Sequence, residues 1–136
     1  IKTQHIARHA SAPTAKVDTN QFSIGIEHVG TAYQSVEEWH DEYSTAELNH
    51  SAELVARLCK KFSITPVRIT LDELKHAKTQ YDNSITVGKK LNGICSHDDV
   101  AKAYKAGDHG DPGKNFPWDE YLKKVVDYYS EIKDLV

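Results

Sequence analysis

Two stretches of the chain repeat apolar side chains at the spacing of an amphipathic helix. The first begins near residue 45 and ends near residue 62, before Pro66, because the residue preceding a proline is disfavoured in helical geometry. Ser44 and Glu47 have capping-box spacing, which predicts the start of this helix. Asp119 begins the second helix. The two apolar stripes are Leu48, Ala52, Val55, Ala56, Cys59 and Phe62, then Leu122, Val125, Val126, Tyr129 and Ile132.

Residues 23–30 alternate in a different way, with the period of two that is typical of a strand. Ile24 and Ile26 share one face, whereas Ser23, Gly25 and Glu27 share the other. Small residues beside a carboxylate leave room for a ligand to approach that second face.

The remaining segments are shorter or more polar. The pattern predicts a short strand over 67–71 and a short helix over 71–80. Turn-forming and polar residues predict loops over 1–21, 31–43 and 83–92.

Length and composition limit the classes of protein that remain. A chain of 136 residues corresponds to one domain that can bury a core of its own. The net charge of −3 argues against a nucleic-acid partner, which requires a basic surface. There is no apolar run near 18 residues, so no membrane span is expected. The chain contains no methionine and begins at Ile1, and we therefore expect residues ahead of Ile1 in the gene product.

Two cysteines are too few for a disulfide-rich framework. They are either free thiols or a single bridge, and the sequence leaves both open. Cys59 lies on the apolar face of the first helix, which favours a buried, unreactive thiol.

Residues 93–118 hold the densest group of chemically versatile side chains. His97 follows a short apolar pair, and Asp111 begins an Asp-Pro-Gly turn. A histidine and an aspartate from separate loops can share one Zn²⁺, which accepts imidazole nitrogen and carboxylate oxygen. Glu27 is a candidate to take a proton from zinc-activated water.

Each of these residues also has an ordinary structural interpretation. His97 can be a surface histidine at a helix start that is capped by Ser96 or Asp98. Asp111 can simply open its turn, Glu27 can end a solvated strand, and His109 can be an exposed loop residue.

The order of these motifs resembles the zinc-dependent N-acetylmuramoyl-L-alanine amidases, which share a fold with the peptidoglycan recognition proteins. The resemblance covers essentially the whole chain. The span from His109 to Trp118 most resembles phage endolysins, and Arg8-His9-Ala10 resembles the Trp-His-Ala segment of the family. The matching stretches are Ser23-Ile-Gly-Ile-Glu27, Gly93-Ile-Cys-Ser-His97 and His109-Gly-Asp-Pro-Gly-Lys-Asn-Phe-Pro-Trp118.

The resemblance implies roles for individual residues. His97 and Asp111 match the second and third zinc ligands, and Glu27 matches the acidic residue that serves as catalytic acid and base. His109 stands where many relatives carry a lysine that stabilises the developing oxyanion, and a histidine can donate to the same oxyanion. Trp118 and His9 are implied to bind substrate.

The chain departs from the family pattern at its start. The first zinc histidine of the family comes several tens of residues before the Trp-His-Ala segment, so this ligand is expected to be absent if Arg8-His9-Ala10 is that segment. His5 or His9 is a possible substitute. Two protein ligands alone would hold zinc poorly.

The elements and the resemblance together predict an α/β fold over residues 1–136, with a mixed central sheet flanked by helices and an N-terminal portion missing. The expected enzyme is a zinc-dependent peptidoglycan hydrolase that cleaves the amide between N-acetylmuramic acid and L-alanine of the stem peptide. It acts on the bacterial cell wall, after release from a host cytoplasm if it is an endolysin, or after secretion otherwise. A separate cell-wall-binding domain can lie outside this chain.

Two other interpretations remain. A relative that lacks one zinc ligand can bind peptidoglycan without cutting it, and a metal-free structural domain would use Asp111 only as a turn residue. The aromatic side chains of Trp118, Trp39 and Tyr33 can stack on sugar or peptide, or they can be ordinary core or rim residues.

Overall fold

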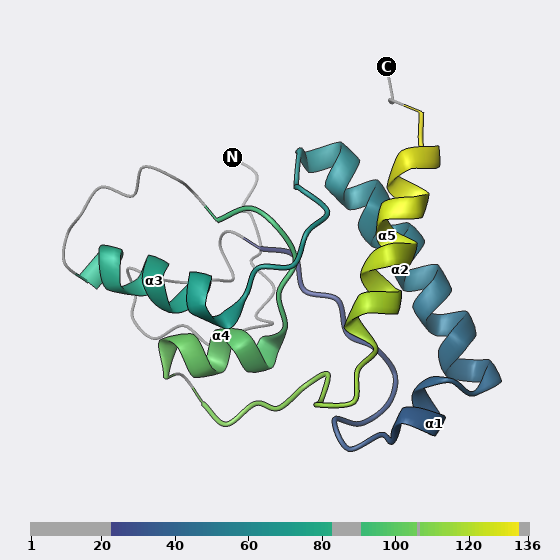
Figure 1. Cartoon of the computed structure of the whole chain (residues 1–136), viewed down its shortest axis with the longest axis horizontal. Helices are drawn as coiled ribbons and strands as arrows, with labels where there is room; N and C mark the ends of the chain where they lie inside the picture. The colour runs from purple at the N-terminus through teal and green to yellow at the C-terminus, as the bar shows by residue number, and fades with distance from the viewer. Residues whose placement is uncertain (1–22, 83–90, 106, 134–136) are drawn as a thin grey trace, which may run out of the picture.

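The computed structural model describes residues 23–82, 91–105 and 107–133, and their regular structure is helical (Figure 1). Two helical pairs make up the architecture. The long α2 packs against the C-terminal α5, and α3 packs against α4. The extended residues 23–30 lie between the pairs in the view of Figure 1. The helices are α1 (Val36–Trp39), α2 (Glu42–Phe62), α3 (Leu71–Asp82), α4 (His97–Tyr104) and α5 (Trp118–Glu131).

The start of α2 differs from the capping box predicted at Ser44 and Glu47. Asp41 is the N-cap, and its carboxylate accepts a hydrogen bond of 2.7 Å from the Ser44 backbone N–H. Ser44 is buried inside the first turn. The short α1, within the predicted loop 31–43, has a capping box of its own, formed by Ser35 and Glu38. Residues 35–47 therefore contain the N-caps of two helices, Ser35 for α1 and Asp41 for α2, where the sequence predicted one.

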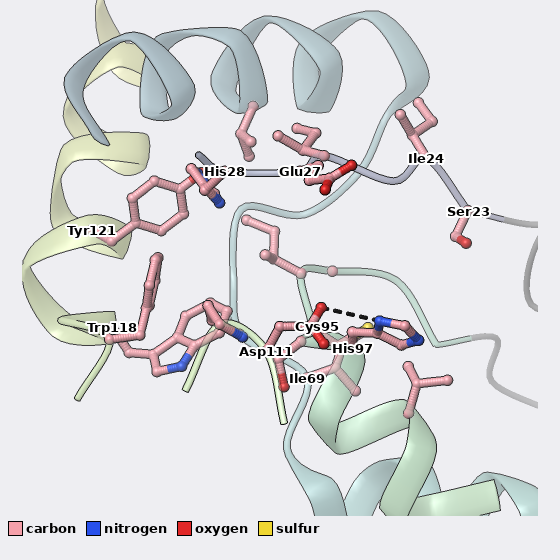
Figure 2. Close-up of a pocket in the computed structure, with 18 of the residues that line it drawn as sticks. Ser23, Ile24, Glu27, His28, Ile69, Cys95, His97, Asp111, Trp118 and Tyr121 are labelled. Carbon is pink, nitrogen blue, oxygen red and sulfur yellow. Dashed lines mark hydrogen bonds and ion pairs between the residues drawn. The ribbon is translucent and has the colours of Figure 1, made fainter. Parts of the chain in front are cut away.

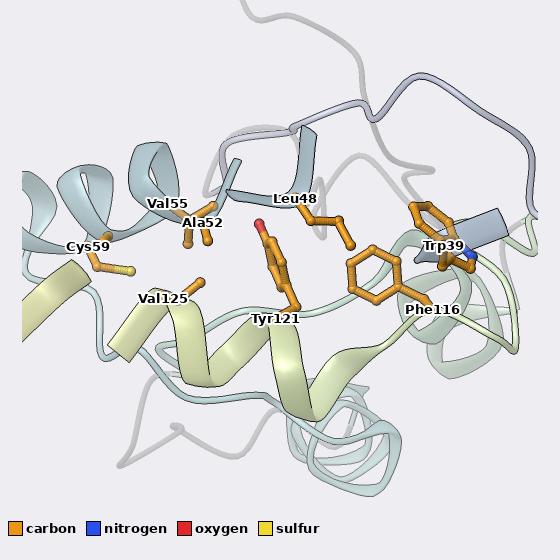
Figure 3. Packing of buried hydrophobic residues seen from close by; sticks show 9 residues of the cluster. Trp39, Leu48, Ala52, Val55, Cys59, Phe116, Tyr121 and Val125 are labelled. Atoms are coloured by element: carbon orange, nitrogen blue, oxygen red, sulfur yellow. The ribbon is translucent and has the colours of Figure 1, made fainter. Parts of the chain in front are cut away.

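The larger core lies between α2 and α5 (Figure 3). The stripe predicted for α2 is buried from Leu48 to Cys59, but Phe62 is exposed. In α5, Tyr121 and Val125 are buried, whereas Val126 is exposed. The buried face of α5 therefore includes Tyr121, which the prediction left out, and excludes Val126, which it included. The buried members of this core are Trp39, Leu48, Ala52, Val55, Ala56, Cys59, Phe116, Tyr121 and Val125.

We expect Val125→Ala to lower the free energy of unfolding by about 2–3 kcal/mol, because it removes two fully buried methyl groups and leaves a cavity. Val126→Ala, one residue further along the same helix and 42% exposed, is the matched control and should change stability by less than about 0.5 kcal/mol. Urea titration of both variants measures the difference. Equal losses would contradict the packing described for α5.

The smaller core joins α3 to α4. Its buried residues come from both helices and from the segment before α3: Ile69, Leu74, Val100 and Ala103. No helix of this pair contacts a helix of the α2–α5 pair in the described part of the chain.

The predicted central sheet is wrong. Among the described residues there is no strand, and the only β-pairing is an isolated parallel bridge between Arg68 and Ile94. It is formed by the Ile69 N–H to the Ile94 carbonyl and by the Ile94 N–H to the Val67 carbonyl, each 2.8 Å long. The strand predicted over 67–71 is therefore reduced to this bridge.

Residues 23–30 are extended as their alternation predicts, but alternation does not supply a partner. The Val29 N–H donates to the Glu47 side chain on α2, where a strand would bond to neighbouring backbone. Ile26 packs against the α2–α5 core whereas Ile24 is 51% exposed, so the alternation reflects a partly covered face and not a strand within a sheet.

The structure also settles two smaller questions. Cys59 and Cys95 are free, and burial raises the pKa of each thiol, which keeps both protonated and unreactive. None of the described helices combines the length and apolar character that crossing a membrane requires.

Candidate active site

A cavity of about 750 Å³ lies where the two helical pairs and the extended segment 23–30 meet. One side carries core residues of the α2–α5 pair, such as Val55 and Tyr121, and the other carries Ile69 and Val100 from the α3–α4 side. The polar side chains of Glu27, His28, His97 and Asp111 face the same space (Figure 2). A mostly apolar cavity with a few polar groups is the usual form of a small-molecule or substrate site.

Three potential metal ligands gather at one edge of this cavity. His97 Nδ1 lies 3.0 Å from Asp111 Oδ2, and the His109 ring stacks on the His97 ring with centroids 3.9 Å apart. One ligand atom from each of His97, His109 and Asp111 lies within 4.8 Å of the others. Two nitrogens and a carboxylate oxygen are a donor set that suits Zn²⁺.

His97 is held by the start of α4. Ser96 is the N-cap, and its hydroxyl accepts a 3.0 Å hydrogen bond from the Asp99 N–H. Ser96 therefore caps the helix, as one of the two structural interpretations of this site predicted. The cap uses the Ser96 hydroxyl and not the His97 side chain. His97 Nε2 is buried without a hydrogen-bond partner among the described residues. The cap therefore fixes His97 at the cavity edge and leaves its ring available for other interactions.

Asp111 is tied to the same helix start through its backbone. Its carbonyl accepts a 3.0 Å hydrogen bond from the Asp98 N–H, one of the free donors at the start of α4. Gly113 follows with φ of +100°, and a Cβ on it would lie 2.1 Å from the Ala32 carbonyl oxygen. The turn predicted from Asp-Pro-Gly thus packs where only glycine fits.

Glu27 approaches the cavity from the other side. Figure 2 shows its carboxylate across the pocket from the His97–Asp111 pair. Ile26 packs against the α2–α5 core, so period-two alternation directs Glu27 away from that core. The chain therefore places a carboxylate and a candidate metal cluster around one space.

His28 lies next to Glu27 and belongs to a polar network that the sequence did not reveal. Its Nε2 is 2.6 Å from Ser51 Oγ, which is 2.7 Å from the Tyr121 hydroxyl. Burial lowers the pKa of His28, and the negative charge of Glu47 opposes part of that effect. Ser51 stands on the buried face of α2, one helical turn after Glu47, and its partners His28 and Tyr121 lie far from it in the sequence.

The lowered pKa of His28 makes stability depend on pH. Below its ordinary pKa of 6.5 the unfolded chain binds a proton that the folded chain resists, so stability falls as pH drops from about 7.5 to 5.5. The pKa of exposed His40 is raised by its bonds to the Val36 carbonyl and to Glu120, which works in the opposite direction. We expect His28→Gln to lose less stability than the wild type over this range. Urea titrations at both pH values measure the difference, and equal losses would contradict a neutral buried His28.

The candidate stacking residues fall into different environments. Trp118 lines the cavity, and the Arg68 guanidinium lies 4.0 Å from its ring centroid while bonding Asp99 at 2.9 Å. Trp39 is 3% exposed and packs edge-on against Phe116 in the core. Tyr33 is 94% exposed on a loop. Trp39 and Trp118 both line the cavity, but Trp39 is buried in the core, whereas the Trp118 ring is held in place by Arg68.

His5 and His9 lie outside the described residues. Within the described part, the sequence identified His97, His109, Asp111 and Glu27. Glu27, His97 and Asp111 line one cavity, and His109 stacks on His97. It missed His28, Ser51 and Tyr121, because their proximity depends on how the segment 23–30 docks on α2 and α5.

A protein-family model described as N-acetylmuramoyl-L-alanine amidase matches residues 1–114. The match includes Glu27 and the three candidate metal ligands and ends four residues before Trp118. No curated protein and no solved structure gives a significant match to the chain.

Proposed function

The chain belongs to the N-acetylmuramoyl-L-alanine amidase family, and on this premise we propose that it is a zinc-dependent peptidoglycan hydrolase. It cleaves the amide that joins the lactyl group of N-acetylmuramic acid to L-alanine of the stem peptide, and so acts on the bacterial cell wall. The observation that carries the proposal is the placement of Glu27 across one cavity from His97 and Asp111, with His109 stacked on His97. The motif from His109 to Trp118 supports an enzyme of the phage endolysin type.

His97 and Asp111 fit two positions of a zinc site, which a third protein ligand would have to complete. His97 Nδ1 and Asp111 Oδ2 are 3.0 Å apart, close to the roughly 3.3 Å that separates two ligands of a tetrahedral zinc ion. In the ion's absence the pair is joined by a hydrogen bond, which metal binding would replace. When bound, zinc supplies Lewis acidity that polarises the scissile carbonyl and lowers the pKa of water.

His109 has a different role in this proposal. Its ring is stacked on His97 with an interplanar angle of 20°, and imidazole lone pairs lie in the ring plane. Two stacked rings therefore do not aim their nitrogens at one point. We assign His97 and Asp111 as ligands, and His109 as a donor that stabilises the oxyanion developing on the substrate carbonyl.

Glu27 carries the proton. Its carboxylate accepts a proton from the attacking water and delivers it to the nitrogen of the departing L-alanine amine. Glu27 is exposed and lines the cavity, so water and substrate can reach it. Trp118 offers a ring face to the muramoyl group or peptide, and we propose that His9 also contacts substrate.

Incubation of the zinc-loaded chain with purified peptidoglycan tests the proposal. New N-terminal L-alanine, detected by amino-group labelling and mass spectrometry, is the expected result, and EDTA should abolish its release. Sedimentation with peptidoglycan in the presence of zinc, without new amino groups, would instead identify a binding module. Neither binding nor cleavage would contradict both.

A further inference from the structure

The segment that carries Glu27 has no strand partner among the described residues, and two hydrogen bonds that involve side chains join it to α2. We propose that His28 is a positioning residue for Glu27, which fixes the direction of its carboxylate by anchoring residues 23–30 to α2 and α5. This inference rests on the proposed function, in which Glu27 transfers the proton.

The anchor consists of contacts on one face of the segment. His28 Nε2 lies 2.6 Å from Ser51 Oγ on α2, and Ser51 lies 2.7 Å from the Tyr121 hydroxyl on α5. The His28 ring also packs against Phe116 at 5.8 Å and Tyr121 at 5.9 Å between centroids. One imidazole thus connects the segment to both helices of the larger pair.

A second bond lies next to it. The Val29 N–H donates to a Glu47 carboxylate oxygen. Glu47 and Ser51 are one helical turn apart on α2, so the two bonds hold consecutive residues of the segment against the same helix face. Two adjacent anchors suppress rotation of the segment about its own axis, which a single bond would allow.

The direction of Glu27 follows from this anchoring. Successive side chains of an extended segment point to opposite faces. Ile26 packs against the α2–α5 core and the His28 ring packs against Tyr121 of α5, where both also line the cavity. Glu27 between them lines the cavity across from His97 and Asp111 (Figure 2). Freed from its anchor, the segment can turn, and the carboxylate then leaves its place opposite His97 and Asp111.

Ser51, His28 and Glu47 have the composition of a nucleophilic triad, but their surroundings exclude that use. Ser51 is 8% exposed and lies in contact with Tyr121 beneath the segment. Its hydroxyl does not line the cavity, so no substrate carbonyl can reach it. Its bonds to two fixed partners suit a structural tether.

The test compares kinetics of the zinc-loaded chain in two backgrounds. Displacing a catalytic group by about 1 Å can cost on the order of 100-fold in rate, so His28→Leu should lower kcat about 10- to 100-fold with KM and bound zinc unchanged. His28→Gln, which can place an amide near the position of Nε2, should recover part of this loss. His50→Leu removes an exposed histidine of α2 and is the matched control.

In a Glu27→Gln background, His28→Leu should cause no further loss, because a residue that acts through Glu27 has nothing left to position. An equal loss in both backgrounds, or kcat of His28→Leu within twofold of wild type while Glu27→Gln is inactive, would overturn the inference. If Glu27→Gln itself keeps full activity, the proposed role of Glu27 fails and this inference fails with it.

Ser51→Ala is a second test of the same hydrogen bond, which can be used if His28→Leu does not fold. It removes the hydroxyl partner of His28 Nε2 and keeps the ring packing intact. The same fall in kcat with unchanged KM is expected, and no fall would overturn the tether.

Discussion

Glu27→Gln should remove hydrolysis and leave zinc binding intact. The amide keeps the size of the side chain but cannot accept a proton, and loss of general acid–base catalysis typically costs about 10²- to 10⁴-fold in kcat. Glu27 lies across the cavity from the metal cluster and outside it, so zinc content should not change. Release of N-terminal L-alanine and metal analysis by mass spectrometry provide the two measurements.

Glu37→Gln, an exposed carboxylate on α1, is the control for the removal of one negative charge. It should retain activity and zinc. Parallel loss of zinc and activity in Glu27→Gln would make Glu27 a ligand, and retained activity would assign proton transfer to another group.

His97→Ala and Asp111→Asn should each weaken zinc binding by at least on the order of 100-fold and abolish hydrolysis. Each variant removes one of the two ligand atoms that already lie 3.0 Å apart. Equilibrium dialysis with Zn²⁺, and visible absorption with Co²⁺ in its place, measure the loss. Asp108→Asn, an exposed carboxylate in the same loop, should bind zinc normally.

Variants of His109 distinguish a role as oxyanion donor from a role as zinc ligand. As an oxyanion donor, His109→Ala should lower kcat by roughly 10²- to 10³-fold and leave most zinc bound. His109→Lys should restore activity, since an ammonium group can donate to the same oxygen. Loss of zinc in His109→Lys would make His109 a ligand and contradict the assignment based on stacked rings.

The sequence predicted local features better than the way they assemble. Helical periodicity located α2, α3 and α5, because the buried face of a helix places apolar residues at every third or fourth position. The prediction of a central sheet was wrong, because alternation in residues 23–30 indicates that one face is more apolar than the other and does not show which element covers it. The same period arises when α2 and α5 form the cover.

The candidate site shows the same division. His97 and Asp111 are 14 residues apart, and a capped helix start next to an Asp-Pro-Gly turn is enough to bring them together. His28 meets Ser51 over 23 residues, and Ser51 meets Tyr121 over 70, so no local pattern signals that network. The family resemblance identified candidate residues of the site, whereas the hydrogen bonds that hold the segment of Glu27 were found only in the structure.

The division of the molecule into two helical pairs has a consequence for ligand binding. Glu27 is fastened to the α2–α5 pair, and His97 and Asp111 are fastened to α4, while no helix of one pair contacts a helix of the other in the described ranges. Arg68, which bonds Asp99 of α4 and lies over the Trp118 ring of α5, already links the two pairs, and a ligand that contacts both walls would add a second link. A substrate analogue that reaches both walls should therefore bind the folded chain more tightly than one that contacts a single wall, and at equal concentration it should raise the melting temperature more.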